Sequence, residues 1–259
     1  MKLKDTVHYK LPKQIMTTLL VLVLVSACIS LTDASLFELL GNLDQMVLFL
    51  KRFMQPDFSY VPQLINPVIK TIQMSIVGTV LGTAFAIPFA FLATKFATEN
   101  NIFSQIIRFL LGIVRTVPNL LLAALFVAII GIGEVTGILT IAVFTFGMVS
   151  QLIYESIETI DLGPIEATKS IGASRLQTAG WAIFPQVLPS IISYAIYAVE
   201  VNVRASTILG YVGAGGIGVL LSTALAQDRY DRVSVIIIII LAIVFLCDAI
   251  SESLRKKVM

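Results

Sequence analysis

Apolar runs long enough to cross a bilayer recur along this chain, and short polar segments separate them. A membrane-spanning helix needs about 20 mostly apolar residues. The runs that approach this length are residues 15–31, 68–94, 109–130, 137–153, 190–209 and 233–250. The pattern predicts an all-α membrane protein, a polytopic helical bundle of about six transmembrane helices.

Composition supports a membrane protein and excludes several kinds of site. Of the 259 residues, 57% are hydrophobic and 13% are charged, whereas soluble domains carry about 25% charged residues. Both cysteines, Cys28 and Cys247, fall inside apolar runs, so no disulfide framework is indicated. The single histidine, His8, argues against a histidine-based metal or catalytic site.

The first 67 residues are expected to form an N-terminal extension. Residues 1–14 are basic and predict a cytoplasmic N-terminus, followed by a first transmembrane helix over 15–31. The basic start, the apolar run and Cys28 also fit a lipoprotein signal, but the run continues through Leu31, which favours a retained span. Within an external segment, 32–67, residues 35–54 show helical apolar spacing and predict an amphipathic helix at the interface; an ordinary surface helix is the alternative.

The distribution of Lys and Arg predicts the orientation. Six spans put both termini on one side, and if that side is the cytoplasm the inner segments hold about twice as many basic residues as the outer ones. This places the polar loop, residues 161–189, in the cytoplasm. One span more or fewer ahead of that loop would reverse the assignment.

The polar loop predicts two short helices joined by a glycine. Pro164 suits a first helical position, and the carboxylate of Glu166 is favoured in a first turn. Gly172 is typical of a helix C-terminus, and Ser174 can cap a second helix carrying Leu176, Trp181 and Phe184 on one side. Pro185 and Pro189 are expected to break or kink the chain where it re-enters the membrane.

Residues of the polar loop carry a family resemblance. Glu166-Ala167-Thr168, then Gly172 and Phe184-Pro185, resemble the cytoplasmic loop of ABC importer permeases, with departures at Thr168, Ala182 and Phe184. The resemblance covers residues 68–259, including Arg115-Thr116-Val117-Pro118. It implies a type I importer permease whose short helix, including Glu166, Ala167, Thr168 and Gly172, docks into a groove of a cytoplasmic ATPase.

A longer stretch is similar to the phosphonate-type permeases. It consists of Pro185-Gln186-Val187-Leu188-Pro189, then Glu200-x-Asn202-Val203-Arg204-Ala205-Ser206-Thr207, and the glycine segment, residues 210–218. This resemblance implies an importer of phosphonate or a related phosphorus oxyanion. The alternative is that a permease of the same architecture imports phosphite, phosphate or another small solute.

Charged and amide side chains in the predicted spans are candidates for the pathway. Glu200 and Arg204 are four residues apart and can pair on one helix face, while Asn202 lies on another face. They predict either a gate for an anion or a buried pair that fixes helix packing. Arg115 has two interpretations as well, a pathway cation or a side chain that snorkels to the interface.

The glycine segment matches G-x-G-x-x-G but lacks the strand and helix of a dinucleotide site. Its glycines instead predict a helical break near the outer face, which either shapes the pathway or serves close packing. They are Gly210, Gly213, Gly215, Gly216 and Gly218.

No chemistry is assigned to the chain itself. No glycine is followed by lysine, so the phosphate-binding loop of an ATPase is missing. No catalytic, metal or cofactor-binding residue is expected; ATP and Mg²⁺ are expected in a separate ATPase.

These features together predict a permease of the cell membrane. Its expected partners are two ATPase subunits, an extracytoplasmic substrate-binding protein, a second permease copy in a homodimer, and membrane lipid, with no nucleic acid. A secondary transporter driven by an ion gradient is the alternative.

Overall fold

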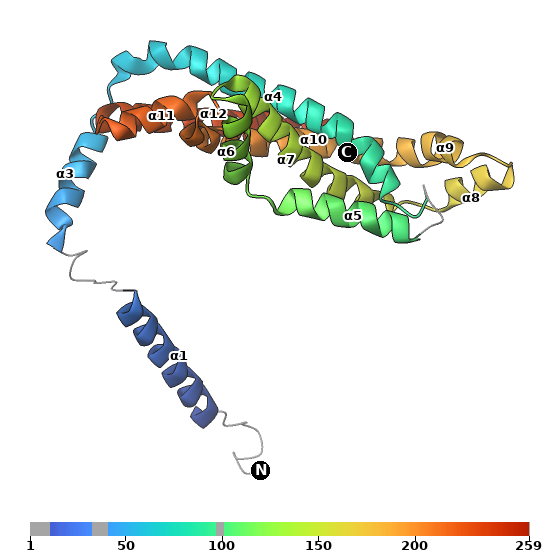
Figure 1. The fold of residues 1–259 in the computed structure, drawn as a ribbon, viewed down its shortest axis with the longest axis horizontal. Helices are drawn as coiled ribbons and strands as arrows, with labels where there is room; N and C mark the ends of the chain where they lie inside the picture. The colour runs from blue at the N-terminus through green and yellow to red at the C-terminus, as the bar shows by residue number, and fades with distance from the viewer. Residues whose placement is uncertain (1–10, 33–40, 97–100, 259) are drawn as a thin grey trace. The chain divides into compact units, whose positions relative to one another are not determined.

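The computed structural model describes residues 11–32, 41–96 and 101–258, and every element within them is a helix (Figure 1). The chain divides into two compact units, 1–52 and 53–259, which are described separately. Five helices are long and apolar enough to cross a bilayer among the described residues, and a bent helix pair raises that number to six. The predicted all-α, multi-span architecture is therefore confirmed.

The first unit contains one apolar and one amphipathic helix. Helix α1, Leu11–Leu31, covers the predicted first span and buries none of its residues within the unit. Helix α3, Leu43–Phe53, has Asp44 in its first turn and Lys51 and Arg52 in its last. It confirms helical structure over part of the predicted 35–54 segment, of which 35–40 lies outside the described residues.

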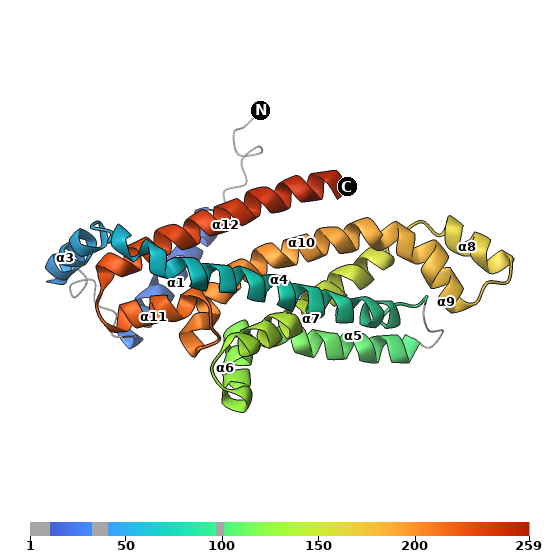
Figure 2. The same cartoon turned by 90° about the horizontal axis from the view of Figure 1, so that it is seen from above.

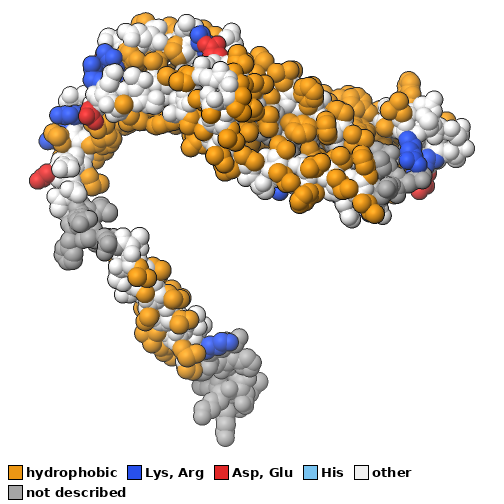
Figure 3. All heavy atoms as spheres, in the orientation of Figure 1, with side chains coloured by type: hydrophobic (Ala, Val, Ile, Leu, Met, Phe, Trp, Pro, Cys, Tyr) orange, Lys and Arg blue, Asp and Glu red, His pale blue; other side chains and the backbone are white. Residues whose placement is uncertain are grey.

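The second unit is built on long helices that pack along one another (Figures 1 and 2). They are α4, Val61–Leu92; α7, Glu134–Ile157; α10, Phe184–Leu209; and α12, Tyr230–Val258. Glycines allow α4 and α7 to approach closely, because a Cβ atom on Gly82 would lie 2.5 Å from the Ala142 carbonyl oxygen. Hydrophobic side chains cover most of the visible face between the two ends of this unit (Figure 3).

The predicted span 109–130 is not one straight helix. Helix α5, Asn101–Thr116, and helix α6, Asn119–Ile130, meet at an 85° bend. Pro118 explains the break, because proline disfavours helical backbone in the residue before it and cannot donate to a preceding turn.

The bent pair nevertheless connects the two ends of the unit. Within α5, Arg108 Nε donates to the carbonyl oxygen of Ala93, just past the end of α4. Beyond the end of the pair, Gly133 N donates to the carbonyl oxygen of Gly213 in the glycine segment, 3.1 Å away. Since α4 and α7 both run from the glycine-segment end toward the polar-loop end, the pair between them supplies one net crossing.

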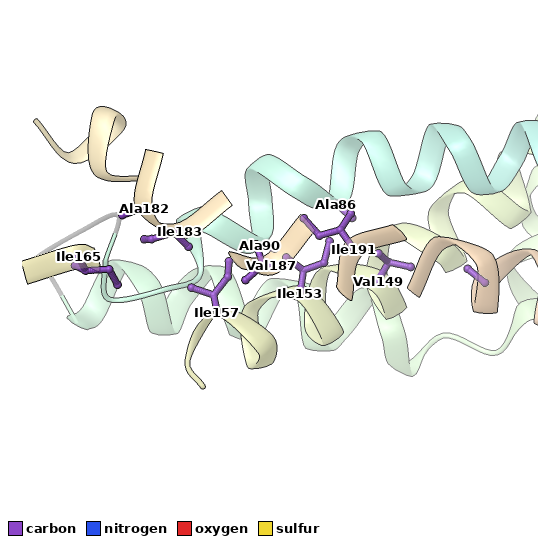
Figure 4. Packing of buried hydrophobic residues seen from close by; sticks show 11 residues of the cluster. Ala86, Ala90, Val149, Ile153, Ile157, Ile165, Ala182, Ile183, Val187 and Ile191 are labelled. Carbon is purple, nitrogen blue, oxygen red and sulfur yellow. The ribbon is translucent and has the colours of Figure 1, made fainter. Parts of the chain in front are cut away.

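The polar loop is tied to the bundle by an apolar cluster (Figure 4). Ile165 from the loop is buried together with residues of α4, α7 and α10, among them Ala90, Ile157 and Val187. Aliphatic burial of this kind is worth about 1.5–3 kcal/mol per large side chain. The loop is therefore anchored on one side, and its other side is left exposed.

The chain does not break where it leaves the polar loop. Helix α9, Arg175–Thr178, continues through a π-helical turn, η3, Ala179–Ile183, directly into α10. The expected break at Pro185 and Pro189 does not occur, and the alternative expectation, a kink, stays a prediction. Both prolines lie within helical backbone, Pro185 in the first turn of α10 and Pro189 further along it.

Short elements close the opposite end. Helix η2, Phe58–Tyr60, precedes α4, and η4, Gly210–Val212, begins the glycine segment. Helix α11, Ile217–Ala226, follows that segment and packs with Leu64 and Val233 in a second apolar cluster. The described bundle thus has a glycine-segment end and a polar-loop end, seen at opposite sides of Figure 1.

Candidate functional site

Helix α8, Gly163–Ser170, forms the exposed face of the polar loop. Asp161 Oδ1 accepts a hydrogen bond of 3.0 Å from Gly163 N and shapes the turn that enters the helix. Pro164 stands at the start and Glu166 in the first turn, as predicted. Glu166 and Ala167 are exposed, whereas Thr168 is half-buried and donates to the carbonyl oxygens of Pro164 and Ile165.

Gly172 ends α8 in the left-handed region. Its φ is +80°, and a Cβ atom there would meet no other atom within 4 Å. Ala173 N donates to the carbonyl oxygen of Thr168, and Gly172 N to that of Lys169. The need for glycine is therefore conformational, because an L side chain in this region costs about 1–2 kcal/mol.

The second loop helix begins with the predicted cap. Ser174 Oγ accepts from Gln177 N, and Gln177 Oε1 accepts from Ser174 N at 2.8 Å. Three large apolar side chains nearby are strongly exposed: Ile171 by 83%, Leu176 by 86% and Trp181 by 81%. Ile171 and Trp181 line a hollow of about 390 Å³ on this surface. Exposed apolar side chains on a polar segment are typical of an interaction site.

A network of four charges joins α10 to α12. The predicted pair is present, with Arg204 Nη2 2.9 Å from Glu200 Oε1. Arg204 also binds Asp248 at 2.8 Å, and Arg255 approaches Glu200 at 3.4 Å. At 1.5 Å per residue, Arg204 and Glu200 lie about 8 and 14 Å along the helix from Leu209, well inside the span.

Asn202 lies on a different face of α10, as predicted, and is completely buried. Its Nδ2 donates to Thr79 Oγ1 at 2.8 Å and to Thr145 Oγ1 at 2.7 Å, which links α10 to α4 and α7. Its Oδ1 is buried without a partner among the described residues. The structure thus separates Asn202 from the charge network.

Arg115 does not lie near the polar-loop end of its span. It stands in the last turn of α5, and its backbone nitrogen is 3.3 Å from the position of a Cβ atom on Gly147, near the middle of α7. Snorkelling requires a position near a membrane surface, whereas the bend directly after this residue leaves Arg115 beside the middle of α7. A side chain at this position is far from the polar-loop end, where snorkelling to the interface was expected to be possible.

The glycine segment is a helical break held by close backbone contacts. A Cβ atom on Gly210 would lie 2.3 Å from Gly218, so these two backbones touch. Gly213, Gly215 and Gly216 have positive φ values. Thr71 Oγ1 accepts from Ile217 N at 2.8 Å and fastens the segment to α4. The segment thus contains a helical break and close backbone contacts, and its role, in the pathway or in packing, stays a prediction.

Sequence reasoning missed partners that are distant along the chain. Asp248 is the acidic residue of the apolar run 233–250, and its isolation there was the available signal. Thr79 and Thr145 carried no such signal, because hydroxyl side chains are common in spans. Lys70 and Glu134 also pair, at the glycine-segment end. No group of three or more potential metal ligands occurs in the described part of the chain.

Comparison with known proteins decides the family. The family described as "Binding-protein-dependent transport system inner membrane component" matches residues 86–259, more than half of the chain. The chain belongs to this family. As a binding-protein-dependent permease, it is the non-catalytic membrane subunit of an ABC importer and a multi-pass inner-membrane protein. This excludes the gradient-driven secondary transporter.

Several curated relatives of this permease are named for phosphorus compounds, and others for D-methionine or choline. The phosphite transport system permease protein PtxC of Stutzerimonas stutzeri is 39% identical over 236 residues, covering 90% of this chain and 85% of that protein. The phosphate-import permease protein PhnE of Mycolicibacterium smegmatis is 34% identical over 207 residues. That alignment covers 80% of this chain but 39% of the relative.

A solved structure confirms the permease fold. An inward-facing structure of the MetNI methionine ABC transporter matches with a TM-score of 0.69 at 20% identity, covering 78% of this chain and 99% of that chain. At this identity the match shows the type I importer fold alone.

Proposed function

We propose that this permease imports a small phosphorus oxyanion, phosphonate or its close relatives phosphite and phosphate. The similarity to permeases named for phosphite and phosphate supports this cargo class. The stretch from Pro185 to Gly218 resembles phosphonate-type permeases and supports the same class. The individual compound depends on an external binding protein, whose affinity for each oxyanion can be measured by calorimetry.

The geometry of the polar loop supports a role in coupling to ATP hydrolysis. Helix α8 is anchored through Ile165 and exposes Glu166, Ala167 and the apolar side chains Ile171, Leu176 and Trp181. This single observation carries the proposal, because an anchored, exposed helix can pass a partner's movement to the spans. The partner is a cytoplasmic ATPase that binds ATP and Mg²⁺, and both termini lie in the cytoplasm.

The assembly contains two permease copies, two ATPase subunits and one substrate-binding protein on the outer side. ATP binding closes the ATPase pair and moves the two polar loops together. The spans then accept the anion from the binding protein, and hydrolysis resets them. Membrane lipid surrounds the bundle, and this chain contributes no cofactor.

Within the bundle, the charge network and the glycine segment are candidates for the pathway. Arg204 remains 46% exposed despite its two carboxylate partners, so it can face an anion. Arg115 is exposed at the bend after α5. Asn202 serves helix packing, because its amide is buried between threonines of two other helices.

Substitution of Gly172 tests the coupling role. Proteoliposomes containing the permease, its ATPase and its binding protein should show ATP-dependent uptake. Gly172→Leu should lower uptake per ATP hydrolysed, because leucine disfavours the positive φ that ends α8. Gly172→Asn should retain more coupling, because asparagine tolerates this region better. Normal coupling in Gly172→Leu, or uptake that persists without ATP, would contradict the proposal.

A further inference from the structure

Arg108 of α5 contacts the ends of two other helices at the polar-loop end of the bundle. Its Nε donates to the carbonyl oxygen of Ala93, the C-terminal cap of α4, at 2.7 Å. Its Nη2 forms an ion pair with Oε1 of Glu158, the C-terminal cap of α7. Its guanidinium carbon also lies 4.9 Å from the centre of the Tyr154 ring on α7. One side chain therefore joins α5 to both α4 and α7.

The charge of Arg108 suits this position. Because α4 and α7 run in the same direction, the negative ends of both helix dipoles lie here, together with carbonyl groups that lack intrahelical donors. Glu158 adds a carboxylate, which a helix C-terminus disfavours unless a cation is near. A guanidinium carries several N–H donors in one plane, so it can serve a carbonyl and a carboxylate together. The contacts of Arg108 therefore favour a state in which α5 stays beside these two helix ends.

Helix α5 has few other firm attachments within its unit. Ser104 and Leu111 alone among its residues are buried, far fewer than in α7. Ser104 Oγ donates to the same Ala93 carbonyl oxygen at 3.0 Å. The stabilisation from apolar burial scales with the area removed from water, so packing holds α5 less firmly than it holds α7. The polar contacts of Ser104 and Arg108 thus have a large part in fixing this half of α5.

These contacts lie between the base of the polar loop and a candidate pathway residue. Glu158 follows α7 directly and precedes Asp161, whose carboxylate shapes the turn into α8. The end of α7 also packs on Ile165 of α8 in the apolar cluster (Figure 4). In the other direction, the exposed cation Arg115 lies about 10 Å along α5 from Arg108 at 1.5 Å per residue, directly before the bend.

We propose that Arg108 is a positioning residue for transport, which holds α5 to the end of α7 when the polar loop moves. Through this contact the bend and Arg115 follow the loop, although Arg108 does not touch the cargo itself. Without it, a moving loop carries α7 through Ile165 while α5 stays behind. ATP would then be hydrolysed with less transport. The inference rests on the proposed coupling role of the polar loop.

The test measures uptake per ATP hydrolysed in proteoliposomes that contain the permease, its ATPase and its binding protein. The probes are radiolabelled methylphosphonate, phosphite and phosphate in equal amounts, and hydrolysis is measured as ADP released. Glu158→Ala removes the ion pair but leaves the contacts of Arg108 with Ala93 and Tyr154. It should lower uptake per ATP about twofold or more, in the range seen for single residues of coupled networks.

Substitutions of Arg108 separate positioning from a merely structural role. Arg108→Ala removes all three contacts and should lower the ratio at least as far as Glu158→Ala does. Arg108→Lys keeps a cation opposite Glu158 and should restore much of the ratio. A structural lesion reduces the amount of folded complex, so it lowers uptake and hydrolysis in the same proportion. Such a parallel loss, with an unchanged ratio, would overturn the proposal.

The matched control breaks an ion pair that joins no two helices. Lys256 pairs with Glu252 at 2.7 Å within α12, and both side chains are exposed. Lys256→Ala should leave the ratio as in the unaltered chain. A fall equal to that of Glu158→Ala would show a general effect of charge and overturn the assignment to Arg108.

The remaining outcomes are also decisive. If Arg108→Ala does not fold, Glu158→Ala decides alone, and a normal ratio in that variant overturns the proposal. Uptake by the unaltered chain that needs no ATP would overturn the proposed function itself. ATP-dependent uptake by the unaltered chain, together with normal ratios in the variants, would overturn this inference alone.

Discussion

At the scale of single residues, Arg204 has either a structural or a transport role, and its contacts make the two roles separable. Its guanidinium binds carboxylates on both α10 and α12, through Glu200 and Asp248. In a structural role, the contribution of Arg204 to stability depends on those two partners. In a transport role, its charge matters to the passing anion whether or not Asp248 is present.

We expect a structural component, measured by a double-mutant cycle on thermal stability in detergent. Arg204→Gln and Asp248→Asn should each destabilise the protein, because each leaves the network of two cations and two carboxylates with a net charge within the span. The double variant should lose less stability than the two single variants lose together. The difference, which is the interaction energy between Arg204 and Asp248, should be about 0.5–3 kcal/mol. Strict additivity would contradict the network. Uptake that recovers in the double variant assigns Arg204 to structure, and uptake that stays low assigns it to the pathway.

Asn202 gives a second prediction at this scale. Asn202→Leu keeps the number of side-chain heavy atoms, although leucine is bulkier, and removes the hydrogen bonds to Thr79 and Thr145. Such bonds between membrane helices are worth about 0.6 kcal/mol on average, so a loss of about 1 kcal/mol in unfolding free energy is expected. Thr145→Val, which removes one of the two bonds, is the matched control and should cost less. Unchanged stability together with abolished uptake would instead place Asn202 in the pathway.

At the scale of elements, the close contact of α4 with α7 depends on Gly82. Gly82→Ala places a Cβ atom 2.5 Å from the Ala142 carbonyl and 2.7 Å from Thr145 Cβ, so the helices must separate. Overpacking of this kind costs about 1–3 kcal/mol and should lower the thermal midpoint of the purified protein. Gly112→Ala is the control, because its Cβ meets nothing within 4 Å and alanine favours a helix. A higher thermal midpoint in Gly82→Ala would contradict the close contact between α4 and α7.

The same scale shows which elements the sequence could predict. Helix α8 and its glycine end follow from Pro164, Glu166 and Gly172, whose effects act within one or two turns. The helical break at the glycine segment is local in the same way. The family resemblance supplied the ATPase as a partner, which local chemistry alone does not identify.

Elements that depend on distant contacts were harder to predict. The bend between α5 and α6 required knowing that Pro118 would not be absorbed within a helix, whereas Pro189 is absorbed in α10. Both are prolines in apolar runs, so the surrounding helices decide the outcome. Asp248 escaped notice as a partner of Arg204 because the two are 44 residues apart.

At the scale of the whole molecule, every coupling argument depends on which side of the membrane holds the polar loop. The positive-inside bias predicts a cytoplasmic loop, and the single net crossing by α5 and α6 is consistent with that prediction. The turn between α11 and α12 lies at the opposite end of the bundle (Figure 1). Cysteines at the two ends should therefore react from opposite sides.

The final prediction concerns Ser170→Cys and Gln227→Cys, each introduced after Cys28 and Cys247 are replaced by serine. Both positions are exposed, at the end of α8 and after α11 respectively. In intact cells stripped of any outer membrane, a membrane-impermeant maleimide should label position 227 and leave position 170 unreacted until the cells are permeabilised. Labelling of 170 alone in sealed cells would put the loop outside, beyond the reach of a cytoplasmic ATPase. Labelling of both from one side would mean that the bundle does not span the bilayer along its long helices.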